Sequence, residues 1–265
     1  MFSNLFWRFL GRHWPIQKGR TRIYRAAWSH LRGEEILRDD FGNRLLLDLG
    51  GFIDTHIALD GAFERENIEL LLKLARERAC STFIDIGANI GVYSLVFARE
   101  QNIRKVYAFE PDPKNLDQLA ANLELNSLKE KVVLSRIALS SRAGEAEFFI
   151  SRGQKELDWS KTNRGTSSLT KNPERHTESI KVQTRPLDDL LDIKGESIAI
   201  KIDVEGHEPE VIGGMRRILL ENDCLIHIEI FPENFDRAEA IFRELGYNAM
   251  KGLELGGENH IYRRI

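Results

Sequence analysis

The chain has 265 residues, of which 42% are apolar and 30% charged, and this length suits one large α/β domain with an additional arm. No run of eighteen apolar residues occurs, so a membrane-spanning helix is not expected. The two cysteines, Cys80 and Cys224, lie beside or within apolar segments and match no metal-binding or disulfide spacing. They indicate buried free thiols, which places the expected location in the cytoplasm.

The net charge of −3 is unevenly distributed. Residues 1–33 carry seven basic residues and no acidic one, so the remainder of the chain has a net charge of −10. The same arm is rich in aromatic and large aliphatic residues. It either packs as an N-terminal helix on the domain or on a partner subunit, or it binds peripherally to the inner face of an anionic membrane. The acidic body argues against a nucleic-acid substrate.

Strands and helices are expected to alternate along most of the chain. Residues 1–60 form the basic aromatic arm with short lead-in strands at 44–49 and 54–58, and residues 61–265 form the main domain. In this domain short apolar runs alternate with helical spacing, which predicts βα units around a mainly parallel sheet. The expected strands are 82–86, 105–110, 131–135, 146–150, 179–185, 198–202, 224–230, 247–251 and 259–264, and the expected helices are 68–75, 89–100, 113–126, 209–220 and 235–245.

The first of these strands ends in a glycine turn, Asp-Ile-Gly-Ala-Asn-Ile-Gly at 85–91, and the second ends in Glu110. Such a turn lets a ligand approach the backbone, and the strand-end acid can accept hydrogen bonds from both hydroxyls of a ribose. Asp85 would repel a pyrophosphate but suits a cationic ligand, so we predict S-adenosylmethionine, which has an ammonium and a sulfonium group and no phosphate. The alternative is that Asp85 caps a helix and Glu110 is a surface acid. The predicted cofactor-binding residues are Asp85, Gly87, Ala88, Asn89, Gly91, Glu110, Ala138 beside the adenine, and Asp203.

These segments, with residues 165–169 and Lys-Ile-Asp-Val-Glu-Gly-His-Glu at 201–208, resemble the FkbM family of S-adenosylmethionine-dependent methyltransferases over residues 61–231. The resemblance implies a class I methyltransferase fold, Rossmann-like, with a seven-stranded, mainly parallel sheet whose last strand is antiparallel. It also implies O-methylation, commonly of a sugar hydroxyl in a polysaccharide, a glycolipid or a glycosylated natural product. It suggests that Glu64 faces the methionine end of the cofactor; an acid favoured by the helix dipole is the alternative.

Methyl transfer to a hydroxyl needs alignment and a base or a metal near the oxygen. Asp203 ends the strand expected beside strand 82–86, so we assign it the role of positioning or deprotonating the acceptor. His207 and Glu229 are the alternatives for this role, and His207 could instead cap a helix. A divalent cation such as Mg²⁺ held by Asp203, Glu205 and Glu229 is possible but not favoured.

The polar segment 151–178 interrupts the alternation and is long for a surface loop, so we interpret it as an inserted acceptor lid. Trp159 is expected to stack on a sugar face, and Arg164, Ser167 and Ser168 to bond its hydroxyls; a simple surface loop is the alternative. The expected acceptor is a sugar or glycolipid. The other possibilities are a lipid or another small molecule as the acceptor, or a cofactor-binding protein without catalysis.

Overall fold

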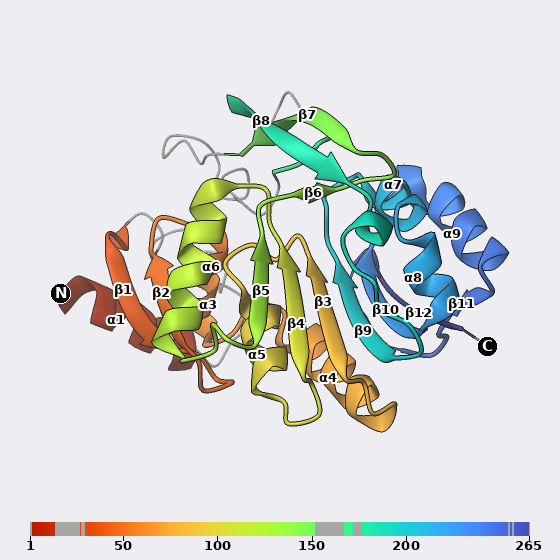
Figure 1. The fold of residues 1–265 in the computed structure, drawn as a ribbon. Helices are drawn as coiled ribbons and strands as arrows, with labels where there is room; N and C mark the ends of the chain where they lie inside the picture. Colours follow the sequence, from red (N-terminus) through yellow and green to blue (C-terminus); the bar gives the residue numbers. More distant parts are fainter. Residues whose placement is uncertain are drawn as a thin grey trace.

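The computed structural model describes residues 2–13, 27, 30–151, 167–171, 176, 178–253, 255 and 257–264, and a large twisted sheet forms its centre (Figure 1). Seven strands pair in the order β11-β12-β10-β9-β3-β4-β5. They are β3 (Thr82–Ile86), β4 (Lys105–Phe109), β5 (Val132–Ser135), β9 (Ser197–Ile202), β10 (Asp223–Glu229), β11 (Tyr247–Ala249) and β12 (Asn259–Arg264). All neighbours are parallel except that β12 runs antiparallel to β10 and β11. The predicted α/β fold with an antiparallel last strand is confirmed.

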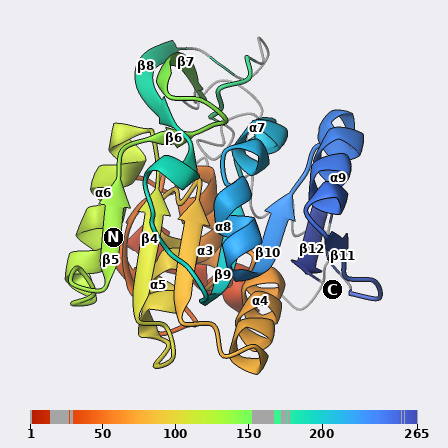
Figure 2. The ribbon, with the colours of Figure 1, turned by 45° about the vertical axis from the view of Figure 1, so that its right-hand side comes forward.

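Alternate residues of the strands enter two cores, one on each face of the sheet. Ile84 and Ile200 belong to one core, whereas Phe83 and Ala199 belong to the other. Helices of the C-terminal half contribute to the first core, and helices of the N-terminal half contribute to the second. The former are α7 (Glu208–Gly213), α8 (Arg216–Glu221) and α9 (Phe235–Glu244), and the latter are α4 (Arg65–Glu77), α5 (Val92–Arg99) and α6 (Pro113–Leu125). In Figure 2, α7 and α8 lie beside β9 and β10, and α9 lies beside β11 and β12.

The single helix predicted at 209–220 is in fact two helices, α7 and α8, which are separated near Gly214. A Cβ atom at Gly214 would lie 2.1 Å from the carbonyl oxygen of Ser140, so the backbone approaches that segment as only glycine allows. The helical spacing of the apolar residues continues across the break, which explains why the sequence pattern did not reveal it.

A second, three-stranded sheet lies above the carboxyl ends of β3 and β4 (Figures 1 and 2). Its strands pair in the order β6-β8-β7, with β6 (Ala138–Leu139), β8 (Glu178–Arg185) and β7 (Gly144–Ile150). The predicted strands at 146–150 and 179–185 are therefore partners of each other rather than of the main sheet. This small sheet covers the carboxyl-terminal edge of the main sheet, which is the edge at which parallel sheets bind their ligands.

The N-terminal segment contains α1 (Phe2–His13), the hairpin β1 (Glu34–Arg38) and β2 (Arg44–Asp48), and α3 (Phe52–Asp60). The prediction of a strand at 54–58 was wrong, because these residues belong to α3. Gly51 and Gly61 delimit this helix, and Gly61 takes the left-handed conformation that commonly ends a helix. Within the described residues, no helix combines the length and apolar character needed to span a membrane.

Side-chain amides attach the β1–β2 hairpin to α6. Asn122 Oδ1 accepts the backbone N–H of Leu46 (2.7 Å), and Asn126 Oδ1 accepts that of Arg44 (2.9 Å). Asn126 Nδ2 also donates to the Arg44 carbonyl (2.7 Å). Leu45 and Leu47 of β2 belong to the same core as Phe83, so the hairpin packs as part of the main domain.

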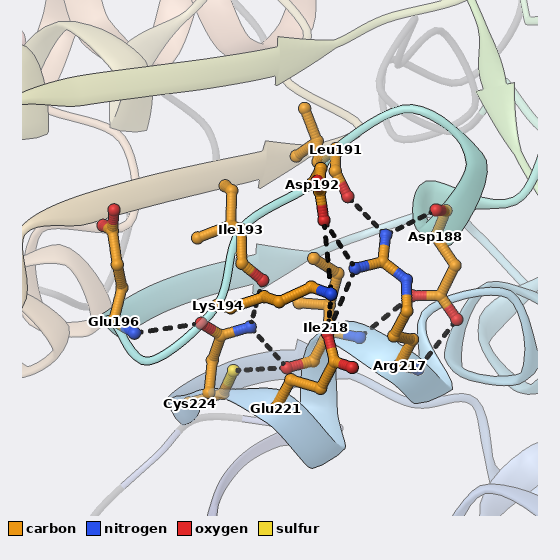
Figure 3. Close-up of polar contacts among 11 residues, drawn as sticks. Asp188, Leu191, Asp192, Ile193, Lys194, Glu196, Arg217, Ile218, Glu221 and Cys224 are labelled. Carbon is orange, nitrogen blue, oxygen red and sulfur yellow. Dashed lines mark hydrogen bonds and ion pairs between the residues drawn. The ribbon is translucent and has the colours of Figure 1, made fainter.

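Polar contacts fasten the segment before β9 to α8 (Figure 3). Arg217 Nη2 donates to the carbonyl oxygens of Asp188 (2.6 Å) and Leu191 (2.5 Å). In return, the Asp188 carboxylate accepts the backbone N–H groups of Arg217 (2.8 Å) and Ile218 (3.0 Å) at the start of α8. These contacts fix the chain that enters β9, whose far end carries residues of the candidate site.

Candidate active site

Two cavities adjoin at the carboxyl ends of β3, β4 and β9, and both are lined by Asn89 and Asp203. We name each cavity after a glutamate that lines it and does not line the other, Glu110 for one and Glu229 for the other. The empty space, including the part that is open to solvent, is about 560 Å³ in the Glu110 cavity and about 670 Å³ in the Glu229 cavity. Gly87, Glu110, Ala138, Ser167 and His207 also line the former, and Glu64, Ala88, Tyr93, Lys201, Glu205 and Glu229 also line the latter.

The glycine turn forms the boundary between β3 and these cavities. Gly87 has φ +77°, and a Cβ atom there would lie 1.9 Å from the carbonyl oxygen of Asp203. Gly91 has φ +90°, and its Cβ would lie 2.0 Å from Leu119 Cδ1 of α6. The two glycines therefore permit the backbone to pass close to the end of β9 and to α6, as the motif predicts.

We expect Gly87→Ala to weaken cofactor binding by about tenfold or more, because the left-handed conformation and the contact with Asp203 both oppose a Cβ atom. Calorimetric titration with S-adenosylhomocysteine measures this. Gly144→Ala in β7 is the matched control, since its Cβ would meet its nearest neighbour, Thr184 Oγ1, at an ordinary 3.6 Å. Equal affinities of the two variants would contradict the assignment of Gly87.

Glu110 follows β4 and is held almost fully buried by backbone donors. Its Oε2 accepts the N–H of Asn89 (2.8 Å), and its Oε1 accepts that of Asp112 (2.9 Å). Burial raises the pKa of Glu110 to about 7, although these hydrogen bonds lower it. The side chain of Asn115 also hydrogen-bonds Glu110. A carboxylate has about four acceptor positions, so about one remains for a donor that enters the Glu110 cavity.

A buried lysine, Lys201 on β9, lies at the centre of several carboxylates. Its Nζ donates to Asp203 Oδ2 (2.9 Å) and to the Gly87 carbonyl (3.4 Å), and it lies 5.1 Å from the ring centroid of Tyr93. Burial lowers the pKa of Lys201, but the carboxylates of Asp203, Asp85 and Glu64 together raise it above its ordinary value. Lys201 is therefore a permanent cation that balances part of this negative charge.

Asp85 lies next to Lys201 in the sheet, because the two residues are register partners on β3 and β9. Asp85 is fully buried, and its Oδ2 accepts the hydroxyl hydrogen of Ser94 (2.6 Å). It lines neither of the two cavities. Its predicted contact with the cofactor stays a prediction; the structure places Asp85 beside Lys201 and outside the lining of both cavities.

Glu64 and Glu229 both line the Glu229 cavity. The Tyr93 hydroxyl donates to Glu64 Oε2 (2.8 Å), which fixes the side chain at the start of α4. Glu229 ends β10, and within the described part of the chain no hydrogen-bond donor contacts its carboxylate. Burial, followed by the charges of Asp203 and Glu64, raises the pKa of Glu229 to about 8. A carboxylate with such a pKa is a much stronger base than an exposed one.

His207 lies apart from these carboxylates, in the lining of the Glu110 cavity. Its Nε2 is 3.0 Å from the hydroxyl of Ser140, and burial lowers the pKa of its imidazole. It does not line the Glu229 cavity. Of the three predicted catalytic candidates, Asp203 and Glu229 thus share a cavity, whereas His207 borders the neighbouring one with Asp203.

The described part of the inserted segment contacts the loop after β9. Ser168 is buried and its hydroxyl donates to the carbonyl of Glu205 (2.6 Å), while the Thr170 hydroxyl donates to that of Gly206 (3.0 Å). The Ser167 hydroxyl accepts the N–H of Ser151 (3.0 Å). These contacts hold a loop in which Glu205 and Gly206 both have positive φ. The predicted contacts of Ser167 and Ser168 with the acceptor stay predictions. Trp159 and Arg164 lie outside the described residues.

Lys201 and Tyr93 were missed as site residues from the sequence. The signal for Lys201 is a lysine inside a strand that is otherwise apolar, since a buried lysine needs charged partners. Tyr93 gave no such signal, because a tyrosine in a buried helix is ordinary. Among the described residues, no group of three or more histidine, cysteine, aspartate or glutamate side chains is arranged to hold a metal ion.

Residues 85–249 match the methyltransferase FkbM domain. The chain belongs to this family. The predicted family, methyltransferase activity and cofactor, S-adenosylmethionine, are thereby confirmed for this domain of the chain.

Two curated relatives carry related names. The chain is 32% identical over 178 residues to the hexuronic acid methyltransferase AglP of Haloferax volcanii, a match that covers 64% of this chain and 65% of the relative. It is 44% identical over 61 residues to the methyltransferase sdnD of Sordaria araneosa, which covers 23% of this chain and 24% of that protein. Less than two thirds of the length of either relative is therefore matched.

The similar solved structures include M. jannaschii TYW2 in complex with AdoMet, with a TM-score of 0.43, 14% identity, and coverage of 89% of this chain and 88% of that one. They also include the precorrin 8W decarboxylase of Methanobacterium thermoautotrophicum, with a TM-score of 0.47, 15% identity, and coverage of 87% and 100%.

The residues present fit S-adenosylmethionine. Beside its contacts with Asn89, Asp112 and Asn115, Glu110 retains an acceptor position for a ribose hydroxyl. The Glu229 cavity contains several carboxylates but one lysine. Lys201 balances only part of the charge of Asp203, Asp85 and Glu64, so this cavity favours a positively charged ligand, which would in turn favour the ionised form of Glu229. Glu110 would therefore hold the nucleoside end, and Glu64 and Glu229 would face the cationic end, with Asp203 between the two.

Proposed function

We propose that this protein is an O-methyltransferase that methylates a hydroxyl of a sugar, in a polysaccharide, a glycolipid or a glycosylated natural product. S-adenosylmethionine supplies the methyl group and is released as S-adenosylhomocysteine. Glu229 would accept the proton of the acceptor hydroxyl, which makes the oxygen of that hydroxyl the nucleophile. Asp203, held by Lys201, positions the acceptor hydroxyl beside it.

The observation that carries the proposal is the Glu229 carboxylate, which lines a cavity adjoining the Glu110 cavity and has a pKa near 8 because of burial and neighbouring charge. A base is most effective when its pKa lies near the working pH. Asp203 is less suited to this task, because one of its oxygens accepts from Lys201 at 2.9 Å. The name of the Haloferax volcanii relative, a hexuronic acid methyltransferase, supports a sugar as the acceptor class.

The test is methyl transfer from labelled S-adenosylmethionine to a panel of acceptors that contains neutral hexosides, hexuronides, sugar-linked lipids, plain lipids and amines. We expect a methyl ether on a sugar ring, identified by mass spectrometry of the product. Transfer to lipids or amines but not to any sugar would refute the sugar assignment. Cofactor binding without transfer to any member of the panel would favour a protein that binds the cofactor without catalysis.

A further inference from the structure

Helix α1 presents two aromatic side chains to the outside of the molecule. Phe6 is 57% exposed and Phe9 is 64% exposed, and their spacing of three residues places them on the same side of the helix. Among the side chains whose exposure the structure describes, a set that omits residues 2–5, no other large apolar one is as exposed; Ile36 follows at 50% and Leu220 at 48%. An exposed aromatic pair on one helix marks a surface that binds something apolar.

The same helix is anchored to the domain by other residues. Gly11 is buried against α3, where a Cβ atom would lie 2.9 Å from Cβ of Leu59. Trp7 is partly buried, and its ring lies 5.3 Å from that of His30. In Figure 1, α1 lies at one edge of the molecule, beyond the β1–β2 hairpin. The helix therefore has a fixed position from which Phe6 and Phe9 point away from the core.

Charge indicates what this surface binds. Residues 1–33 contain seven basic residues and no acid, whereas the rest of the chain has a net charge of −10. Arg8, which lies between the two phenylalanines in sequence, is partly exposed, and its contact with Glu35 is a long 3.4 Å. Exposed apolar side chains on a segment with a net positive charge complement a bilayer with anionic head groups, where each basic residue adds to the attraction.

We propose that α1 is an interfacial helix that docks the protein on an anionic membrane, with Phe6 and Phe9 inserted among the lipid head groups. The basic residues of the arm contact the lipid phosphates. This inference goes beyond the proposed function, because it rests on the N-terminal helix and not on the active site.

Flotation of the full-length protein with lipid vesicles tests the proposal. Vesicles of phosphatidylglycerol and phosphatidylcholine are compared with vesicles of phosphatidylcholine alone, at low and high salt. We expect binding to the anionic vesicles to be about tenfold stronger or more, and to weaken with salt because the attraction is partly electrostatic. The double variant Phe6→Ser/Phe9→Ser should lose about tenfold of this binding or more, because two aromatic side chains no longer insert.

Leu220→Ser is the matched control, since Leu220 is an exposed apolar residue on α8, far from α1 in sequence. It should bind vesicles like the unchanged protein, and thermal unfolding together with S-adenosylhomocysteine titration checks that all variants are folded. Equal binding to both vesicle types, no binding to either, or undiminished binding of the double variant would each overturn the proposal. So would a concentration-dependent dimer that the double variant abolishes, which would assign the surface to a second copy of the chain. None of these outcomes bears on the acceptor panel.

Discussion

Glu110→Ala should weaken S-adenosylmethionine binding by more than about 100-fold, because hydrogen bonds to a charged acceptor contribute roughly 1.5–3 kcal/mol each and about 1.4 kcal/mol is tenfold in affinity. The loss includes the hydrogen bond that Glu110 offers to a ribose hydroxyl. It also leaves the N–H groups of Asn89 and Asp112 without the acceptor they have in the folded protein. Calorimetric titration with S-adenosylhomocysteine measures the effect.

Two further variants refine this experiment. Glu110→Gln keeps the shape but replaces one acceptor oxygen by an amide donor, so we expect an intermediate loss of about tenfold. Glu124→Ala removes a glutamate that is fully exposed on α6 and should bind like the unchanged protein. If Glu110→Ala bound the cofactor as tightly as Glu124→Ala, the Glu110 cavity would not be the nucleoside site.

Glu229→Gln should lower kcat by about 10²–10⁴-fold, the usual contribution of a general base. The amide keeps the volume of the side chain but cannot accept the proton of a hydroxyl. The exposed Glu233→Gln on the following turn is the matched control and should retain full activity. Retained turnover in Glu229→Gln would transfer the base role to Asp203, and Asp203→Asn would then be the variant that loses it.

The pH dependence provides an independent readout of Glu229. Because the pKa of Glu229 in the free protein is about 8, kcat/KM should rise with pH up to about 8, and the Gln variant should lack this limb. Burial is the main cause of this high pKa. The negative charges of Asp203, Glu64 and Glu258 raise the pKa further, and the positive charge of Lys201 lowers it. A kcat/KM that stays constant between about pH 6 and about pH 9 would contradict the role of Glu229 as the base.

The stability of the ligand-free protein should change in the opposite direction. A carboxyl group with a raised pKa binds its proton more tightly in the folded state, so this stabilisation is complete below the ordinary pKa of 4.5 and is lost as the pH rises to about 8. Glu229→Gln should therefore melt about 5 °C above the unchanged protein at high pH, on the order of 2 kcal/mol, and show no such gain near pH 5. Thermal unfolding at both pH values checks this expectation.

Local sequence patterns predicted the parts of this site that depend on local chemistry. Gly87 and Glu110 follow from a glycine turn and a strand-end acid, because backbone conformation and strand ends are properties of short segments. The fold class follows from the alternation of strands and helices for the same reason. In contrast, residues 54–58 were predicted as a strand because apolar and polar residues alternate in this part of the chain. The sequence of α3 has no clear helical period, and only Gly51 and Gly61 mark its ends.

The rest depends on contacts between distant segments. Lys201 acquires its role because β9 pairs with β3 in a register that places it beside Asp85. Tyr93 acquires its role because α5 brings its hydroxyl to Glu64, 29 positions earlier. The hydrogen bond from the Ser168 hydroxyl to the Glu205 carbonyl similarly joins segments that are 37 residues apart. Such pairings are set by the sheet register and by helix packing, which a pattern in a single short segment does not contain.

The attachment of the β1–β2 hairpin to α6 determines where a shortened chain can begin. A chain starting at residue 61 would lack Arg44 and Leu46, so Asn122 and Asn126 would lose backbone partners, and Leu119 would lose part of the core around it. The side chain of Leu119 also packs directly against Gly91 of the glycine turn. Truncation at the N-terminus would thus loosen the glycine turn that lines the candidate site, whereas a chain starting just before Glu34 would keep the contacts of the hairpin with α6.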